Sequence, residues 1–177
     1  MFPKIVGLAI CATMLAANVY ADPEQPYVGL NYGLMTDHTY SSNGNNQRMG
    51  EVVARFGDDL NEYFGVEAHL ATGASDAKLS NGVTNESLHL YSMESAFAKP
   101  QIQVESFSLY GLLGVSVWRT ALTGATINKT WSSDHGAALG AGVRVPLTTS
   151  GQWLFDATYV HLKNSQSYAM AGVDYRF

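Results

Sequence analysis

Histidines and serines are the side chains with the chemistry to catalyse a reaction, and their spacing favours no catalytic or metal site. The five histidines form no HExxH motif and no pair at the spacing of metal ligands (His38, His69, His89, His135 and His161). Hydrolysis by a side-chain nucleophile needs a base beside it and an acid that orients the base. Lys163 stands two residues after His161, Ser165 and Ser167 follow, and no acid comes before Asp174. We predict no catalytic and no metal-binding residues, and keep His161 as the single enzymatic alternative.

The glycines and the charge balance predict neither a cofactor nor a nucleic-acid partner. Gly140-Ala141-Gly142 matches the start of a dinucleotide-binding fingerprint, but Val145 stands where the third glycine belongs and no crossover helix follows. Ten basic residues against fifteen acidic ones give a net charge of −5, with no basic patch for nucleic acid.

Several segments alternate in residue character, and their regularly spaced charges all fall on the same set of every-second positions. We call such a set a parity. We predict that these charges form an interior charge network, either lining a small pore or plugging it with paired groups. The members of this predicted network are Glu51, Arg55, Glu67, Glu94, Arg144, Asp156, Asp174 and Arg176.

The elements that must position these charges are strands. Apolar and other residues alternate with a period of two in eight segments, bounded by Gly, Asn, Asp, Ser and Pro clusters. The segments lie near 26–35, 48–57, 62–72, 88–98, 105–118, 133–145, 152–162 and 168–177. Each is about the 9–11 residues that a tilted membrane strand requires, or slightly longer.

The apolar parity of these segments carries no Asp, Glu, Lys or Arg. The fifth segment shows the pattern clearly in its run from Phe107 to Val117, whereas the fourth is the least regular, with Tyr91, Met93, Ser95 and Phe97 assigned to the apolar side. The opposite parity holds the charges and many glycines. A soluble barrel has a densely charged outer face, but a membrane barrel needs a charge-free exterior and a crowded polar interior. The parity therefore predicts a transmembrane β-barrel.

The ends of the segments predict an orientation. With the N-terminus in the periplasm, nine aromatic residues fall at the periplasmic rim, where an aromatic girdle is expected: Tyr27, Phe56, Phe64, Phe97, Phe107, Trp153, Phe155, Tyr175 and Phe177. The connections at that rim are short. The connections 35–47, 73–87 and 119–131 are long and polar, as outer loops are.

The first residues predict a cleaved secretory signal. Lys4 precedes an apolar stretch too short to span a bilayer, and small residues lead to a cut after Ala21. The domains would then be a signal peptide (1–21) and one barrel domain (22–177). Cys11, the single cysteine, lies within the signal and follows Ile10, which argues against lipidation.

Several segments resemble the small eight-stranded outer-membrane barrels typified by outer-membrane protein X, the Ail-type adhesins and the transmembrane domain of OmpA. The resemblance is carried by SLYGLLGVSVWR (108–119), HGAALGAGVRVPL (135–147), WLFDATYV (153–160), AMAGVDYRF (169–177) and YFGVEAHLATG (63–73), where Glu67 matches an inward glutamate. It implies an all-β fold, an eight-stranded antiparallel barrel in the bacterial outer membrane. The closing Val173, Tyr175 and Phe177 resemble the signal by which such barrels are recognised for assembly.

The expected function is that of a non-enzymatic envelope or surface-interaction protein. Its expected partners are outer-membrane lipid, lipopolysaccharide, the barrel assembly machinery and a host or surface ligand at the three long loops. The uniform apolar face predicts a monomer. Two alternatives stay open: an enzyme that modifies lipid A through His161, and a small passive channel through the charged interior.

Overall fold

The computed structural model describes residues 25–42, 45–80, 85–124, 130–163 and 166–177. The predicted signal peptide lies outside these residues. The strands are β1 (Gln25–Ser42), β2 (Asn45–Asn61), β3 (Phe64–Ser75), β4 (Ala77–Ser80), β5 (Asn85–Val104), β6 (Phe107–Gly124), β7 (Thr130–Pro146), β8 (Trp153–Leu162) and β9 (Gln166–Arg176). Among the described residues, no helix has the length and apolar character to cross a membrane.

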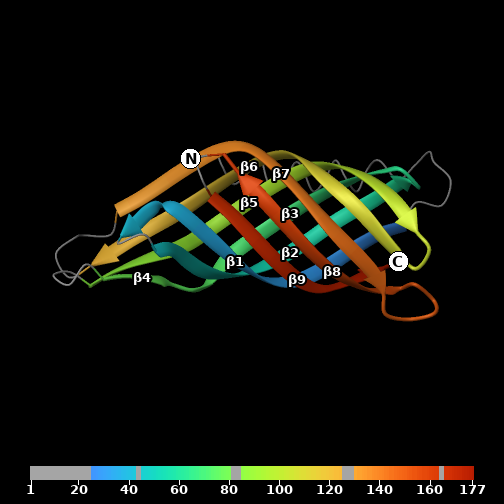
Figure 1. Cartoon of the computed structure of the whole chain (residues 1–177), viewed down its shortest axis with the longest axis horizontal. Coiled ribbons are helices and arrows are strands. Elements are labelled where there is room, and N and C mark those ends of the chain that lie inside the picture. The colour runs from blue at the N-terminus through green and yellow to red at the C-terminus, as the bar shows by residue number, and fades with distance from the viewer. Residues whose placement is uncertain (1–24, 43–44, 81–84, 125–129, 164–165) are drawn as a thin grey trace.

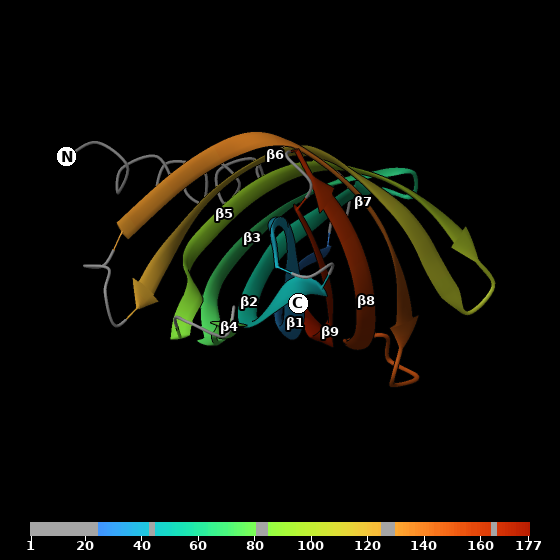
Figure 2. The ribbon, with the colours of Figure 1, turned by 60° about the vertical axis from the view of Figure 1, so that its left-hand side comes forward.

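The strands form one closed antiparallel barrel (Figures 1 and 2). Along most of the ring each strand pairs with its neighbours in sequence, and two further pairings close it. One joins β1 to β9, for example Leu30 to Val173, and the other joins β3 to β5, for example Glu67 to Phe97. The four-residue β4 follows β3 after Asp76 and pairs with the start of β5, so β3 and β4 act as one interrupted wall strand. The predicted eight-stranded antiparallel barrel is confirmed.

The two ends of the barrel differ in their connections. Short turns at 62–63, 105–106 and 147–152 lie at the end that also holds Gln25 and Phe177, which we call the terminal end. At the other end, the hairpin end, the strands run further than their alternation predicted: β1 continues to Ser42 and β6 to Gly124. The predicted loops 35–47, 73–87 and 119–131 are therefore partly strand. Backbone pairing continues there, while alternation is lost because neither face needs to be apolar.

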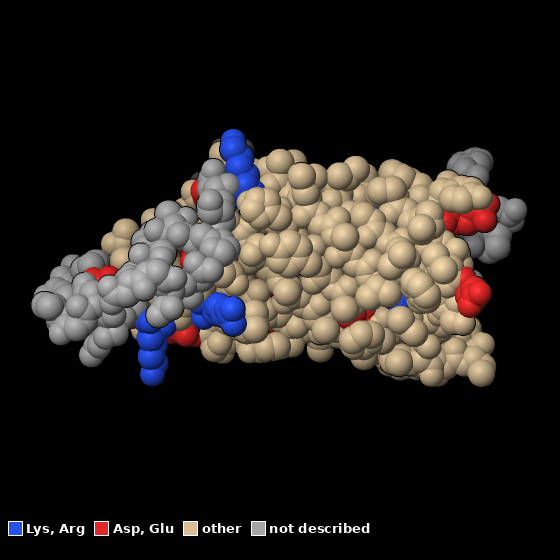
Figure 3. Space-filling view, in the orientation of Figure 1, with Lys and Arg blue, Asp and Glu red and all other residues tan. Residues whose placement is uncertain are grey.

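The outer face of the barrel is apolar around its middle. Leu30 on β1, Val115 on β6, Leu139 on β7 and Tyr159 on β8 are each more than half exposed. In the space-filling view the middle of the barrel shows almost no charge, and Lys and Arg gather at the hairpin end, on the left (Figure 3). The predicted apolar parity faces outward on every strand except β5.

A bulge explains the exception on β5. Leu90 pairs with Thr120 and Ser92 pairs with Arg119, so Tyr91 is an extra residue in the ladder. One extra residue reverses which parity faces inward beyond it. The buried residues of β5 are accordingly Leu88, Leu90, Met93, Ser95, Phe97 and Lys99.

The bulge overturns two predictions. Glu94 is exposed on the outer face, so its assignment to the interior network is wrong, as is the outward assignment of Met93, Ser95 and Phe97. Phe97, which the bulge turns inward, is 3% exposed, and Tyr27, an inward residue of β1, is 1% exposed. Neither therefore belongs to the predicted outer aromatic girdle.

The interior is filled by two layers. Toward the hairpin end it is mostly apolar, although Asp37, Glu51 and Gln166 are also buried there. Its apolar side chains include Met35, Met49, Val53, Leu88, Leu90, Met93, Leu112, Trp118, Ala138, Val160, Leu162, Tyr168 and Met170. Toward the terminal end it is occupied by buried charged groups. An interior with one mostly apolar half was not predicted. In the sequence, the inward positions of the strands show charges, glycines and apolar residues without a clear order.

Candidate functional site

The charged half of the interior is built by inward residues of adjacent strands. Arg55 on β2 and Asp174 on β9 both pair with Gly29, which lies between them on β1. Arg144 on β7 pairs directly with Asp156 on β8. Because paired residues face the same side of a sheet, these charges must meet inside the barrel.

Glycines on the inner face make room for two tyrosine rings. A Cβ atom at Gly57 would run into the ring of Tyr27, and one at Gly142 would run into the ring of Tyr110. Both rings lie across the barrel and carry hydroxyls into the charged region. The glycines of the charged parity therefore serve close packing of aromatic rings against the wall.

Arg55 is a central cation of the cluster. Its Nη2 lies 2.6 Å from Oε2 of Glu67, and its Nη1 pairs with Asp156 and lies 3.5 Å from Asp174. All four side chains are fully buried. Three carboxylates thus depend on one guanidinium for part of their charge compensation.

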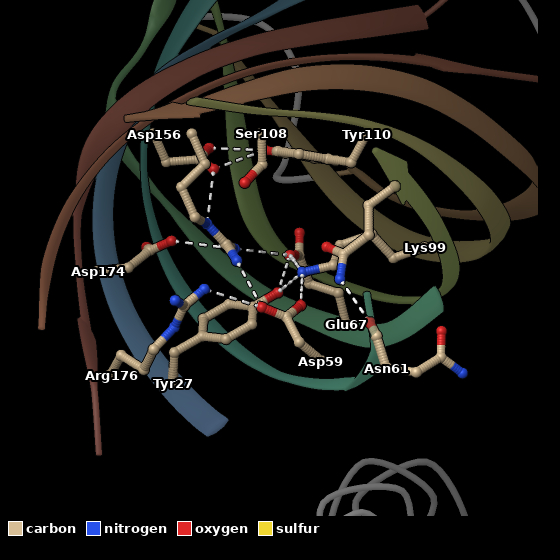
Figure 4. A network of polar contacts seen from close by, with 12 residues as sticks. Tyr27, Asp59, Asn61, Glu67, Lys99, Ser108, Tyr110, Asp156, Asp174 and Arg176 are labelled. Carbon is tan, nitrogen blue, oxygen red and sulfur yellow. Dashed lines mark hydrogen bonds and ion pairs between the residues drawn. The ribbon is translucent and has the colours of Figure 1, made fainter. Parts of the chain in front are cut away.

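Arg144 is the second shared cation. It lies 3.2 Å from Asp174, 3.4 Å from Asp59 and 3.6 Å from both Glu67 and Asp156. Its guanidinium carbon stands 3.9 Å from the centroid of the Tyr27 ring, within the range of a cation–π contact. Arg144 therefore connects Asp156 to Asp59 near the terminal end. Figure 4 shows Asp156, Asp174 and Asp59 within this cluster.

Two cations complete the cluster near the terminal end. Lys99 donates to Oδ1 of Asp59 at 2.5 Å and to the hydroxyl of Tyr27 at 2.8 Å. Arg176 lies 3.0 Å from Oδ2 of Asp59 and is one-quarter exposed at the mouth. The linked ion pairs join four cations to four carboxylates: Arg55, Lys99, Arg144 and Arg176, with Asp59, Glu67, Asp156 and Asp174. These eight groups carry no net charge in their ionised forms.

Histidine and tyrosine side chains extend the hydrogen bonds toward the apolar layer. His69 contacts Oε1 of Glu67 through Nε2 at 2.6 Å and the hydroxyl of Tyr168 through Nδ1 at 2.8 Å. The Tyr110 hydroxyl donates to the Asp156 carboxylate at 2.7 Å. Glu67 also accepts from Tyr27. Cross-strand contacts of this kind tie five strands, β1, β3, β6, β8 and β9, into one interior.

The structure brings six of the eight predicted network residues together. Glu51 is buried but lies elsewhere, beside Gly33, and neither of its carboxylate oxygens has a hydrogen-bond partner among the described residues. Glu94 lies outside the barrel. Sequence reasoning missed Asp59 and Lys99, which lie just beyond the strands predicted near 48–57 and 88–98. It also missed Tyr27, which was assigned to the aromatic girdle, and Tyr110, which the predicted charge network did not include.

The packing of the cluster suits a structural role. Its charges are compensated within the barrel, and the described residues offer no group of three or more His, Cys, Asp or Glu that could hold a metal ion. His161 is exposed on the outer face and pairs across the ladder with Ser167. In the described ranges, the ion pairs between histidine and carboxylate are those of His69 with Glu67 and of His89 with Asp76. Among the described residues, His161 thus has no carboxylate partner of the kind that a hydrolytic triad needs.

The closed barrel, its apolar belt and its ionic interior agree with what comparison with protein families finds. The family model of the outer membrane protein beta-barrel domain matches residues 7–177. The chain belongs to this family. It is an outer-membrane protein of bacteria, as the sequence predicted. A comparison with curated proteins found no match.

Solved structures show the same fold. Ail of Yersinia pestis, in complex with the heparin analogue sucrose octasulfate, is 22% identical, with 87% of this chain and 97% of that chain covered and a TM-score of 0.55. The N-terminal barrel of OprF from Pseudomonas aeruginosa is 13% identical over 88% of this chain and 100% of that one, with a TM-score of 0.59. OprG from the same organism is 13% identical over 89% and 97%, with a TM-score of 0.61. At these identities the likeness concerns the fold.

Proposed function

We propose that this protein is a non-enzymatic outer-membrane barrel with a sealed core, which acts in envelope structure or surface interaction through its hairpin end. The observation that carries the proposal is the filled interior. An eight-stranded barrel is just wide enough for side chains to fill. Here an apolar layer containing Leu112 and Trp118 lies in series with the neutral ionic cluster, so two kinds of packing block the path of an ion.

The proposed orientation places the terminal end in the periplasm. Short turns at that end and long hairpins at the other follow the asymmetry of outer-membrane barrels. The rings of Trp153 and Tyr175 lie 5.0 Å apart, and those of Tyr175 and Phe177 lie 5.3 Å apart, at the terminal end of the outer face. Such a row of aromatics suits the membrane interface.

The proposed partners follow from this placement. The apolar belt would contact outer-membrane lipid, and the barrel assembly machinery would recognise Val173, Tyr175 and Phe177. A surface ligand would bind at the hairpins 35–47, 73–87 and 119–131. The complex of Ail with a heparin analogue supports surface binding by a barrel of this fold. The uniformly apolar belt favours a monomer.

Conductance in planar lipid bilayers tests the sealed core. We expect no reproducible single-channel steps after insertion, with insertion verified by the heat-modifiable gel mobility of the recovered protein. Regular steps would show that the interior opens and would favour the channel alternative.

Mass spectrometry of lipid A tests the enzymatic alternative. Overexpression of the protein is expected to leave the acylation of lipid A unchanged. A change in acylation that the variant His161→Ala abolishes would contradict the non-enzymatic assignment.

A further inference from the structure

A break in the ladder between β5 and β6 lies beside a groove on the outer face of the barrel. Ala98 pairs with Leu113 and Gln101 pairs with Tyr110, while the two residues between them on each strand have no partner in this ladder. Pro100 lies in the break, and it lacks the N–H that a ladder bond needs. The groove at this place has a volume of about 450 Å³.

Apolar side chains and a glycine form most of the lining of the groove. Tyr63, Ile102 and Leu109 line it and are 65%, 54% and 41% exposed. Gly111 also lines it, and a Cβ atom there would come no closer than 3.4 Å to Cγ of Pro100. Packing therefore does not require this glycine, and the missing side chain leaves room for an apolar chain from outside the protein.

The groove lies at the level of lipid acyl chains. Gly111 is four residues from Phe107, where β6 begins at the terminal end. With a rise of about 3.3 Å per residue and a tilt of about 40°, Gly111 lies about 10 Å inside an apolar band that is about 25 Å tall. In the proposed orientation, the groove therefore faces the periplasmic leaflet.

Two carboxylates stand next to the groove at the terminal end. Glu62 precedes Tyr63, and hydrogen bonding to its carboxylate raises the pKa of the Tyr63 hydroxyl. Glu105 lies in the turn that joins β5 to β6, three residues beyond Ile102. Both glutamates are exposed, and neither forms an ion pair with another described residue. In Figure 3, acidic side chains appear at the terminal end, on the right, whereas Lys and Arg gather at the hairpin end.

The backbone conformation at Glu105 favours a functional role for its side chain. Its φ angle is 47°, in the left-handed region that glycine adopts freely and that residues with a side chain disfavour. The turn consists of Glu105 and Ser106, between the paired Val104 and Phe107, and asparagine or glycine is preferred in such a turn. Backbone strain of this kind gathers at functional sites.

We propose that the groove binds a phospholipid with a primary-amine headgroup, of the phosphatidylethanolamine class. One acyl chain lies over Gly111 and Pro100, and the ammonium group meets the carboxylates of Glu62 and Glu105. A primary ammonium carries three N–H donors, so it both neutralises and hydrogen-bonds these carboxylates. A quaternary ammonium has the charge without the donors, and an anionic headgroup is repelled. The leaflet follows from the proposed orientation, whereas binding in detergent does not depend on it.

Lipid titration of the protein in neutral detergent, followed by native mass spectrometry, tests the site. The probes are phosphatidylethanolamine, phosphatidylcholine and phosphatidylglycerol with identical acyl chains. We expect the double variant Glu62→Gln/Glu105→Gln to weaken binding of phosphatidylethanolamine about tenfold, because charge-assisted hydrogen bonds are lost, and to change binding of phosphatidylcholine much less. Glu94→Gln is the matched control, since it removes an exposed carboxylate from the outer face of β5 nearer the hairpin end, and it should change little.

Two further variants separate the groove from the fold. Glu105→Gly relaxes the strained turn, so it should weaken binding of phosphatidylethanolamine while the free energy of unfolding stays the same or rises. Gly111→Leu fills the groove, so it should weaken binding of all three lipids while the heat-modifiable gel mobility is retained.

Two results would overturn the inference. Equal affinity of the wild type for phosphatidylethanolamine and phosphatidylglycerol would overturn the headgroup assignment, and unchanged binding by Gly111→Leu would overturn the groove. Both are distinct from a failure of the proposed function, because conductance and lysine labelling measure the sealed core and the orientation separately.

Discussion

At the scale of single residues, the interior depends on glycines as much as on charges. Arg55 and Arg144 each contact several carboxylates. The rings of Tyr27 and Tyr110 fit only because the residue paired with each on the neighbouring strand is a glycine. A buried ion pair contributes little by itself, but an uncompensated buried charge is costly. Stability at this scale therefore comes from every group having its partner in place.

Substituting Gly142 by alanine tests the fit of the ring. The new Cβ atom would overlap the Tyr110 ring, so we expect Gly142→Ala to lower the free energy of unfolding by about 1–3 kcal/mol. Urea titration of the protein refolded in lipid vesicles measures this change. The control is Gly111→Ala, whose Cβ atom would meet its nearest neighbour, Cγ of Pro100, at an ordinary 3.4 Å. Equal stability of both variants would contradict the packing argument.

At the scale of elements, β5 and β9 show how far alternation predicts a strand. Alternation predicted β9 and the outward side of Val173, Tyr175 and Phe177. On β5 it failed beyond Tyr91, because the bulge adds one residue to the strand and so reverses the side of the sheet that every later side chain faces. Nothing in the local sequence marked the bulge, since Tyr91 is a common strand residue. The same bulge turns Lys99 inward to the ionic cluster, where it pairs with Asp59.

The end of β9 is proposed to serve assembly. Phe177 is 68% exposed, its backbone N–H donates to the carbonyl of Pro26 at 3.0 Å, and its ring contributes little to the interior. We expect deletion of Phe177 to reduce insertion into the outer membrane more than export, because the recognition signal is lost while the core is intact. The ratio of heat-modifiable to periplasmic protein measures this.

The variant Phe56→Ala is the control for that deletion. It removes a ring of 37% exposure from the terminal end of the outer face without touching the C-terminus, so its insertion should stay near that of the wild type. Normal insertion of the chain lacking Phe177 would count against the assembly role.

At the scale of the whole molecule, closure of the barrel separates an apolar exterior from an ionic interior. Closure removes every sheet edge within the lipid band, as an apolar medium requires. It also gives two lysines different environments. Lys78 on β4 is exposed at the hairpin end, whereas Lys99 on β5 is fully buried. The access of an external reagent to these two lysines therefore reports which end of the barrel faces the cell exterior.

Labelling of intact cells with a membrane-impermeant amine reagent tests the orientation. We expect modification of Lys78 but not of Lys99, detected by peptide mass spectrometry. Denatured protein should be modified at both positions, which controls for intrinsic reactivity. Labelling of Lys78 only after the outer membrane is permeabilised would reverse the proposed orientation.

The amino-acid sequence by itself determined the class, the compartment and most of the strand order, because a charge-free parity is a local consequence of contact with lipid. It also placed Arg55, Glu67, Arg144, Asp156, Asp174 and Arg176 on the inner side. Only the tertiary structure decided which charges meet, that Glu94 faces outward and that half of the interior is mostly apolar. The reason is that pairing across the barrel depends on register and closure, which bring together residues as distant as Asp59 and Arg176 and which no local period records.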